Sequence, residues 1–447
     1  MRYIPNTPGQ QREMLETIGV SSIEDLLVRI PPKARLSRPL NLPGAMAEMD
    51  LVRHLRRLGA ENASADDYAC FLGGGAYDHA VPSPINHLVS RGEFFTAYTP
   101  YQPEASQGTL RTIYEYQSMI AELCGMEVAN ASIYDGASSL AEAVLMAHAV
   151  NGRDGIVLSR SVNPLYHQVV ETYCEGPNLR LRSAPLADGL TDPDALRKIV
   201  TGATAGVVVQ YPNFFGCLED VKAVAEIAHA VGALLIVVAD PVNLGLLTPP
   251  GALGADIVVG EGQGLGVPLS FGGPNLGVFA TRQDLVRRMP GRLAGATVDV
   301  DGARGFVLTL QTREQHIRRE KATSNICTNV ALCALMATIY LAIMGRRGLR
   351  RVGELSVAKA HYAAAEFAKV PGVRLRFGAP FFKEFTLQLP KSPERVVRRL
   401  MKHKILGGVP LKAFDRQYKD CLLVAVTEKR TRDEIDAYAA ALAAAVA

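Results

Sequence analysis

Short apolar runs recur along the middle of the chain and are separated by longer stretches with helical periodicity. Runs of strand length lie at 155–158, 205–209, 233–239, 256–259 and 276–280. Stretches of helical length lie at 139–150, 219–231 and 313–344. Continuous Val, Ile and Leu runs that alternate with helices indicate a mainly parallel sheet covered by helices on both faces.

The two ends of the chain have different patterns. Prolines punctuate the first 45 residues around one helical pattern at 10–29, which indicates an extended arm that packs on the main body or on a neighbouring subunit. The last hundred residues combine helical patterns at 356–369, 393–403 and 432–446 with strand-like runs at 384–389 and 422–426. We therefore predict an N-terminal arm at 1–60, a large α/β domain at 61–345 and a small C-terminal α+β domain at 346–447.

Composition narrows the class of protein. The net charge of +4 over 447 residues comes without a Lys/Arg-rich run interleaved with aromatics, so no nucleic-acid partner is expected. The apolar run 331–344 is shorter than the ~20 residues of a membrane span, and the N-terminus is polar, so neither a membrane segment nor a signal peptide is expected. Seven cysteines without a CxxC pair indicate reduced thiols in a cytoplasmic protein. Nine histidines without HxxxH or HExxH spacing predict no metal site.

In an open parallel sheet, ligands bind beyond the strand ends, where loops turn into helices, and four loops of this kind stand out. The first loop precedes the helix at 139–150 and consists of Asp135, Gly136, Ala137 and Ser138. Its backbone N–H groups could hold a phosphate, or Asp135 could form an ordinary helix N-cap. Asn213 follows the strand at 205–209, and Asp240 follows the strand at 233–239. A carboxylate at a buried strand end can hold a cationic ring nitrogen, and the alternative for Asp240 is a capping role.

The loop after the next strand, at 260–277, is rich in glycine but contains no lysine. It lacks the GxxxxGK[ST] pattern of phosphate-binding loops, and no helical pattern follows it, so a dinucleotide site is not indicated. The order of these loops matches pyridoxal-phosphate enzymes of the aminotransferase build, in which a lysine here binds the cofactor aldehyde. This chain has no lysine between Lys222 and Lys321, and Lys321 lies in a basic, helix-like run.

Several long motifs resemble the glycine cleavage system P-protein, glycine dehydrogenase (decarboxylating). They occur at 71–75 (FLGGG), 94–108 (FFTAYTPYQPEASQG), 130–137 (NASIYDGA), 304–311 (RGFVLTLQ) and 313–327 (REQHIRREKATSNIC). The resemblance extends from about residue 3 to the C-terminus. It implies an aspartate aminotransferase-like fold of type I, an α/β fold with a mainly parallel seven-stranded sheet and a small C-terminal α+β domain.

The length and the missing lysine resemble the α subunit of the two-subunit form of this family. The resemblance implies an α2β2 assembly in which the β subunit binds pyridoxal phosphate covalently. It places Gln263 at the lysine position, before Val267 and Pro268, and an amide cannot form the imine. We therefore expect no catalytic residue and no covalent cofactor in this chain.

The resemblance also implies a reaction, in which glycine is decarboxylated and its aminomethyl group passes to the lipoyl arm of the H-protein. The loop expected to reach the β active site contains Tyr98, Thr99, Tyr101, Gln102, Glu104 and Ser106; the alternative is a purely structural interface loop. A vestigial cofactor pocket would be lined by Asp135, Gly136, Ala137, Ser138, Asn213, Asp240 and Gln263. The resemblance implies a His before Pro164 where this chain has Asn163, so a ring that could stack on a cofactor is missing here.

Two other functions remain as alternatives. A stand-alone pyridoxal-phosphate lyase would require a reactive lysine near the sheet. A non-catalytic binding or regulatory subunit, sensing glycine or a lipoylated protein, would leave turnover unchanged when it is omitted.

Overall fold

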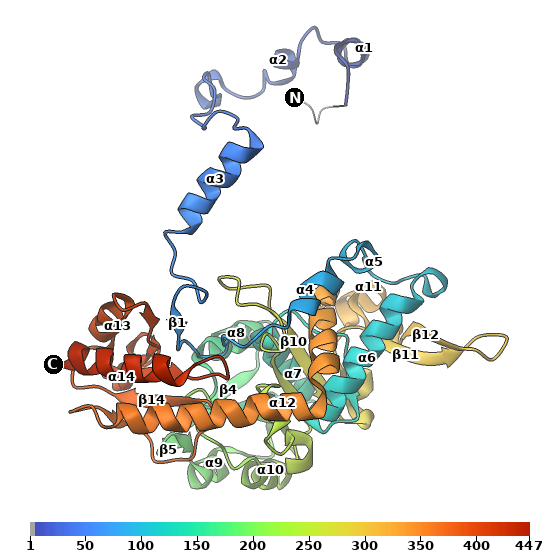
Figure 1. Ribbon diagram of the computed structural model, residues 1–447. Helices are drawn as coiled ribbons and strands as arrows, with labels where there is room; N and C mark the ends of the chain where they lie inside the picture. Colours follow the sequence, from blue (N-terminus) through green and yellow to red (C-terminus); the bar gives the residue numbers. More distant parts are fainter. Residues whose placement is uncertain (1–4) are drawn as a thin grey trace. The chain divides into compact units, whose positions relative to one another are not determined.

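A computed structural model of the chain describes residues 5–447, which form two units divided between Ala63 and Ser64 (Figure 1). The second unit is built around a seven-stranded sheet with the order β2-β10-β9-β8-β7-β3-β4. Its strands are β2 (Val128–Ala129), β3 (Gly155–Ser159), β4 (Arg180–Ala184), β7 (Thr204–Tyr211), β8 (Leu234–Ala239), β9 (Ile257–Glu261) and β10 (Gly277–Thr281). Only β10 runs antiparallel to its neighbours in this sheet. The five predicted strands and the mainly parallel sheet are confirmed.

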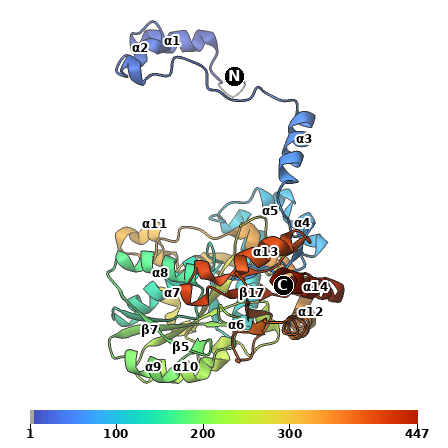
Figure 2. The ribbon, with the colours of Figure 1, turned by 90° about the vertical axis from the view of Figure 1, so that its left-hand side faces the viewer.

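Helices cover both faces of this sheet. Successive side chains of a strand point to opposite faces, so each strand contributes to both hydrophobic cores. In β7, Val207 and Val209 are buried in one hydrophobic core, and Val208 is buried in the other. One core is formed with α7 (Gly136–Asn151) and α8 (Pro164–Glu175). The other is formed with α6 (Gln107–Cys124), α10 (Val221–His229) and the long helix α12. Figure 2 shows α7 and α8 on one side of β7 and α10 on the other.

The helix α12 (Ala331–Phe367) corrects the predicted helix at 313–344. Residues 313–321 form only the short turns η6 (Gln311–Arg313), α11 (Gln315–Arg318) and η7 (Arg319–Lys321), and no helix follows before Ala331. Ser324 Oγ accepts a hydrogen bond from the N–H of Ile326, a local contact that competes with helical bonding. The helix then continues past 344, with non-helical backbone at Gly345 (φ 55°). The predicted helix at 356–369 is therefore its second half.

The C-terminal residues form a second, antiparallel sheet with the order β13-β14-β17-β16. These strands are β13 (Arg374–Leu375), β14 (Glu384–Gln388), β16 (Val409–Pro410) and β17 (Cys421–Ala425). The helices α13 (Pro393–Met401) and α14 (Arg432–Val446) pack on it with the end of α12, which runs beside α14 in Figure 1. The α+β character of this segment and the positions of its predicted elements agree with the sequence. The division into large and small domains at 345 stays a prediction.

A hairpin of β11 (Leu293–Val298) and β12 (Arg304–Thr309) packs on α6 and was not predicted. Its inward side chains, Ala294, Phe306 and Leu308, share a core with Leu110 and Ile113 of α6. The other short elements of this unit are β1 (Ala69–Cys70), α4 (Ser83–Val89), α5 (Gly92–Phe95), η2 (Pro103–Ala105), β5 (Leu186–Ala187), β6 (Leu190–Thr191), α9 (Pro193–Ile199), η3 (Asn243–Gly245), η4 (Pro250–Leu253), η5 (Gln283–Arg288), β15 (Ile405–Leu406), η8 (Leu411–Ala413) and η9 (Arg416–Tyr418).

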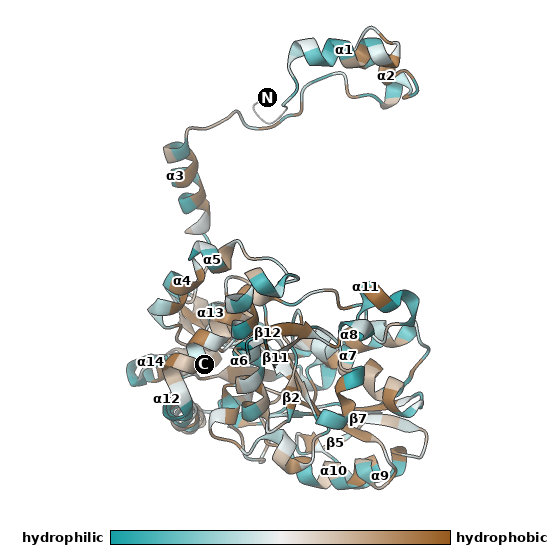
Figure 3. Ribbon diagram, turned by 90° about the vertical axis from the view of Figure 1, so that its right-hand side faces the viewer, coloured by the Kyte–Doolittle hydropathy of each residue, from teal (hydrophilic) through white to brown (hydrophobic). Residues whose placement is uncertain are grey.

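The first unit covers the segment predicted as an arm, and residues 1–4 lie outside the described part of the chain. It contains α1 (Pro8–Ile18), α2 (Ile23–Leu26), η1 (Pro32–Ala34) and α3 (Glu48–Gly59). The predicted helix at 10–29 is thus divided, because Gly19 ends α1 in the left-handed region (φ 85°). Apolar Leu51, Leu55 and Leu58 recur at helical spacing along α3 and are exposed, and Figure 3 shows brown and teal residues along this helix. The expectation that the arm packs on another surface stays a prediction.

Candidate functional site

The predicted pocket residues lie at the edge of the sheet where its parallel strands end. Because β7, β8 and β9 are neighbours, Asn213, Asp240 and Gln263 follow adjacent strands. The helix α7 begins at the same edge after its N-cap, Asp135. The sheet thus brings the predicted residues to one region, as the order of the loops suggested.

Asp240 faces Lys383, a lysine that no motif or spacing had selected. The Nζ atom of Lys383 lies 2.5 Å from Oδ2 of Asp240, and the lysine is only 2% exposed. The two groups form an ion pair, and Oδ2 has no other polar partner within the described residues. The other oxygen of Asp240 accepts from the N–H of Val242, which is the capping role considered as the alternative. Lys383 lies about 140 residues away in sequence and belongs to the C-terminal sheet region, so no local pattern identified it.

Gln263 is held at both ends of its amide. Its Oε1 accepts from the N–H of Tyr77 at 3.1 Å, and its Nε2 donates to the carbonyl of Val267 at 2.6 Å. The residue is 4% exposed. Its side chain therefore closes the loop after β9 and connects it to the segment that contains Tyr77.

The side-chain amide of Asn213 likewise forms all of its hydrogen bonds within the chain. Its Nδ2 donates to the carbonyl of Gly189 and to Oε1 of Glu219, and its Oδ1 accepts from the N–H groups of Phe215 and Cys217. An amide has two donor hydrogens and two acceptor positions, and all of them are used. Asn213 therefore shapes the turn after β7.

The loop at Asp135–Ser138 forms the N-terminus of α7, but a carboxylate of the chain already faces it. Asp135 accepts from the N–H of Ser138 at 2.7 Å, which is an ordinary N-cap. The N–H of Gly136 donates to Oε2 of Glu261 at 3.1 Å. Ala137 lies between Gly136 and Ser138 as the second residue of the helix. The N–H groups of Gly136 and Ser138, at the first and third positions of the helix, are thus already bonded within the chain.

A small cavity of about 20 Å³ lies at this edge. It is lined by Tyr77, Gln210, Pro212, Asn213, Gly216, Asp240, Asn243, Lys383 and Glu384. Burial raises the pKa of Glu384 to about 7, although hydrogen bonds from Gly74 and Tyr77 lower it. The cavity has room for about one water molecule, whereas pockets for small ligands measure roughly 300–1,000 Å³. These residues do not fit pyridoxal phosphate.

The predicted partner loop is exposed at its aromatic tips and fixed at its base. Tyr98 is 82% exposed and Tyr101 is 57% exposed. Gln102 and Glu104 are also exposed, and Ser106 precedes α6 without capping it. Gln107 pairs with β12 by donating to the carbonyl of Phe306 and accepting from its N–H, both at 2.9 Å. The loop therefore presents its rings from a rigid base.

A buried arginine holds the other end of this loop and was missed from the sequence. The guanidinium of Arg292 donates to Oγ1 of Thr99 at 2.7 Å, to Oγ1 of Thr328 at 2.9 Å and to the hydroxyl of Tyr101 at 3.3 Å. It also lies 5.5 Å from the centroid of the Tyr101 ring. Arg292 is 2% exposed, and the carboxylate of Glu314 lies 3.8 Å from its Nε.

The motifs of the family resemblance meet around Arg292. Thr99 belongs to the motif at 94–108, and Glu314 belongs to the motif at 313–327. Asn329 donates to the carbonyl of Ala131, and the N–H of Val330 donates to Ser132 of the motif at 130–137. Segments that are far apart in the sequence thus form one network beside the exposed loop.

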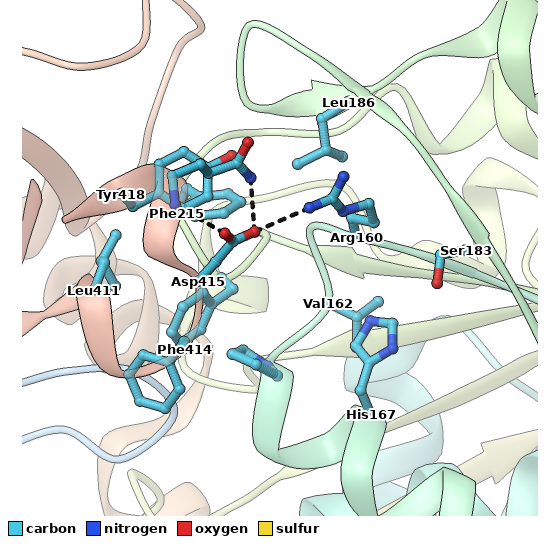
Figure 4. A pocket seen from close by; sticks show the side chains of 13 residues that line it. Arg160, Val162, His167, Ser183, Leu186, Phe215, Leu411, Phe414, Asp415 and Tyr418 are labelled. Carbon is cyan, nitrogen blue, oxygen red and sulfur yellow. Dashed lines mark hydrogen bonds and ion pairs between the residues drawn. The ribbon is translucent and has the colours of Figure 1, made fainter.

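A separate crevice of about 190 Å³ lies between the ends of β3 and β7 and the turns η8 and η9 (Figure 4). Arg160 donates to Asp415 at 2.9 Å across it, and Gln417 donates to the same carboxylate. His167 is bonded to the carbonyl of Ser159, and burial lowers its pKa. None of the predicted site residues lines this crevice, and these polar groups are already paired.

Comparison with known proteins identifies the family to which the chain is related. Residues 1–442 match the family model of the glycine cleavage system P-protein. The chain is 54% identical over 442 residues to a probable glycine dehydrogenase (decarboxylating) subunit 1 of Moorella thermoacetica, covering 99% of each chain. It is 52% identical over 436 residues to the protein of the same description from Carboxydothermus hydrogenoformans, covering 98% of each.

Solved structures are similar to this chain as well. A crystal structure of glycine decarboxylase (P-protein) of the glycine cleavage system, in inhibitor-bound form, matches with a TM-score of 0.90 and 49% identity over 100% of both chains. A sphingosine-1-phosphate lyase from Burkholderia pseudomallei, at 17% identity and a TM-score of 0.65, shares the fold. The predicted aspartate aminotransferase-like fold of type I is thereby confirmed. The chain belongs to the glycine cleavage system P-protein family.

Proposed function

We propose that this chain is the α subunit of a glycine decarboxylase and works with a β subunit of similar fold in an α2β2 assembly. The proposal rests on one observation: a chain similar over its whole length to subunit 1 of glycine dehydrogenase (decarboxylating) carries the amide of Gln263 where the family resemblance places the cofactor lysine. Pyridoxal phosphate bound in the β subunit would supply the electron sink for loss of CO2 from glycine. The aminomethyl group would then pass to the lipoyl arm of the H-protein.

The contribution of this chain is to complete the site of its partner. Tyr98 and Tyr101 project from a loop whose base is fixed by Arg292 and Gln107. Exposed aromatic rings on a rigid base lose little conformational entropy on contact and suit a protein interface. In the proposed assembly this loop lines the entrance through which the lipoyl arm reaches the β active site. The seven cysteines are free thiols, which is consistent with a cytoplasmic assembly.

The test is glycine-dependent exchange of labelled bicarbonate in the presence of H-protein. The full chain alone, the β subunit alone and the mixture are compared, with the visible absorbance of bound pyridoxal phosphate recorded for each. We expect exchange only in the mixture and the absorbance only in samples that contain β.

Two outcomes would contradict the proposal. Exchange by β alone, unchanged when this chain is added, would identify a non-catalytic regulatory subunit. Exchange by this chain alone would identify a stand-alone enzyme, and its reactive lysine would have to be found by borohydride reduction and peptide mapping.

A further inference from the structure

Lys383 places a buried ammonium group against the carboxylate that follows β8. Its Nζ lies 2.5 Å from Oδ2 of Asp240, 2.8 Å from Nε2 of His79 and 3.8 Å from the centroid of the Tyr77 ring. A buried charge is stable only when it is paired and hydrogen-bonded. The carboxylate that could hold a cationic ring nitrogen is thus already paired with a cation of the chain itself.

The pairing continues beyond His79. An ammonium group can only donate, so Nε2 of His79 accepts from Lys383 and Nδ1 donates to Oε2 of Glu428 at 2.6 Å. Burial opposes ionisation of Glu428, but the hydrogen bonds from His79 and from the N–H of Ala80 lower its pKa to about 2. Lys383 therefore lies in a line of buried groups with a carboxylate at each end.

Glu261 fills the position that a phosphate would need at the start of α7. Its side chain accepts from three backbone N–H groups, those of Gly136 at 3.1 Å and of Gln263 and Leu276 at 2.9 Å. The N-terminus of a helix is a general anion site because its N–H groups have no partner within the helix. Here Oε2 of Glu261 accepts from the first of these N–H groups, that of Gly136, and Asp135 accepts from that of Ser138. A Cβ atom on Gly136 would also collide with the hydroxyl of Tyr166.

We propose that the chain fills its ancestral cofactor pocket with its own side chains, Lys383 in place of the ring cation at Asp240 and Glu261 in place of the phosphate at α7. The loss of a lysine at position 263 prevents covalent attachment only. The self-filled pocket, which we define by Lys383, Asp240 and Glu261, prevents non-covalent binding as well. It also joins the C-terminal sheet region to the end of β8 through an ion pair.

This inference concerns the chain by itself and does not depend on the proposed decarboxylase. In a pocket filled by its own side chains, a lysine at position 263 is not enough to restore cofactor binding. If the missing lysine were the only obstacle, it would be enough. The space beside Asp240 measures about 20 Å³, so the cofactor ring could enter only if Lys383 left.

The ligand arm of the test uses equilibrium dialysis of the purified full chain, without its partner, against pyridoxamine phosphate. This amine lacks the aldehyde and cannot label surface lysines, so retention reports a non-covalent pocket. We expect the wild-type chain and Gln263→Lys to retain no ligand above the buffer blank. Retention of one molecule per wild-type chain would overturn the proposal, whatever the activity of the mixed subunits.

A covalent arm tests Gln263→Lys with pyridoxal phosphate, borohydride reduction and peptide mass spectrometry. Exposed lysines should be labelled in proportion to reagent, and positions 263 and 383 should stay unlabelled. Stoichiometric labelling at either position would show that the pocket opens to the cofactor and would overturn the proposal.

The ion-pair arm is a double-mutant cycle on thermal unfolding with Lys383→Met, Asp240→Asn and the double variant. Each single change leaves one buried charge without its partner and should lower Tm by about 5–10 °C. The double variant should lose less than the sum of the two shifts. Lys429→Met is the matched control, because Lys429 pairs with Asp78 at 2.6 Å and should show no coupling to Asp240→Asn. Additive shifts for Lys383 and Asp240 would overturn the ion pair, and the dialysis result stands even if a single variant fails to fold.

Discussion

The guanidinium of Arg292 lies 2.7 Å from Oγ1 of Thr99 and so fixes the loop that carries Tyr98 and Tyr101. Replacing Arg292 by Met keeps the aliphatic stem and removes the hydrogen bonds from the guanidinium to Thr99 and Tyr101. The change leaves the buried carboxylate of Glu314 with one fewer cation, so the free energy of unfolding should fall by about 2–4 kcal/mol. We expect bicarbonate exchange by the mixed subunits to fall about tenfold or more, because a displaced loop loses ~1.4 kcal/mol of positioning.

Two variants control for this change. Tyr101→Phe removes only the hydrogen bond of 3.3 Å and keeps the ring under the guanidinium, so it should cost ~1 kcal/mol or less. Arg304→Met removes an exposed arginine that lies over the Phe306 ring, and it should leave exchange unchanged. If Arg304→Met and Arg292→Met reduce exchange equally, Arg292 has no special role in positioning the loop.

The sequence predicted the central sheet because its strands carry their own signal. Each of β7, β8 and β9 is an apolar run buried on both faces, and such runs stand out without any partner strand. The hairpin of β11 and β12 has only short apolar runs, at 293–296 and 306–308, and only part of each strand is buried. The error at 313–344 had a different cause: Glu314 and Asn329 are held by tertiary contacts that helical periodicity does not include.

Tyr98→Ala separates the two interpretations of the loop. The side chain is 82% exposed, so its removal should change the free energy of unfolding by less than about 0.5 kcal/mol. If the loop lines the entrance to the partner site, exchange at saturating β subunit should fall about tenfold, a loss of ~1.4 kcal/mol. Met401→Ala, which removes an exposed apolar side chain on α13, should change neither the free energy of unfolding nor the exchange rate.

The measurement is exchange titrated with β subunit, which gives the apparent Kd and the maximal rate together. A change in Kd with an unchanged maximal rate would mean that the loop is a structural contact only. That result would favour the purely structural interface loop considered from the sequence.

Asn213→Ala tests whether this amide is structural. The change leaves the buried N–H groups of Phe215 and Cys217 without acceptors, so the free energy of unfolding should fall by about 3–5 kcal/mol. Asn213→Asp keeps both acceptor bonds but places a carboxylate beside Glu219, so it should recover stability only at acid pH. Asn86→Ala, at an exposed position on α4, should change it by less than about 0.5 kcal/mol. Urea unfolding checks the series, and equal effects at positions 86 and 213 would contradict it.

Only some residues of the candidate pocket could be predicted from the sequence. Asp240 and Gln263 could be selected because strand ends and loop order are local features. Lys383 and Glu261 could not, because their importance depends on which group they face across the fold. Lys383 precedes an ordinary strand of the C-terminal sheet, and only the packing of that sheet brings its ammonium to Asp240.

Glu142 gives the chain a pH dependence that its surface charges would not predict. This residue of α7 is 3% exposed, and burial raises its pKa from the ordinary 4.5 to about 7 although a hydrogen bond with Ser324 lowers it. The folded chain therefore holds the proton to a higher pH than the unfolded chain, so stability is lost as pH rises from about 4.5 to about 7 and the loss stays constant above that. Glu142→Gln removes the titration and should stabilise the chain by up to about 3 kcal/mol at pH ~8 with little effect at pH ~4.5. Urea unfolding at both pH values checks this, with exposed Glu175→Gln as the control, and a gain from Glu142→Gln that is the same at both would show that the carboxyl does not titrate in this range.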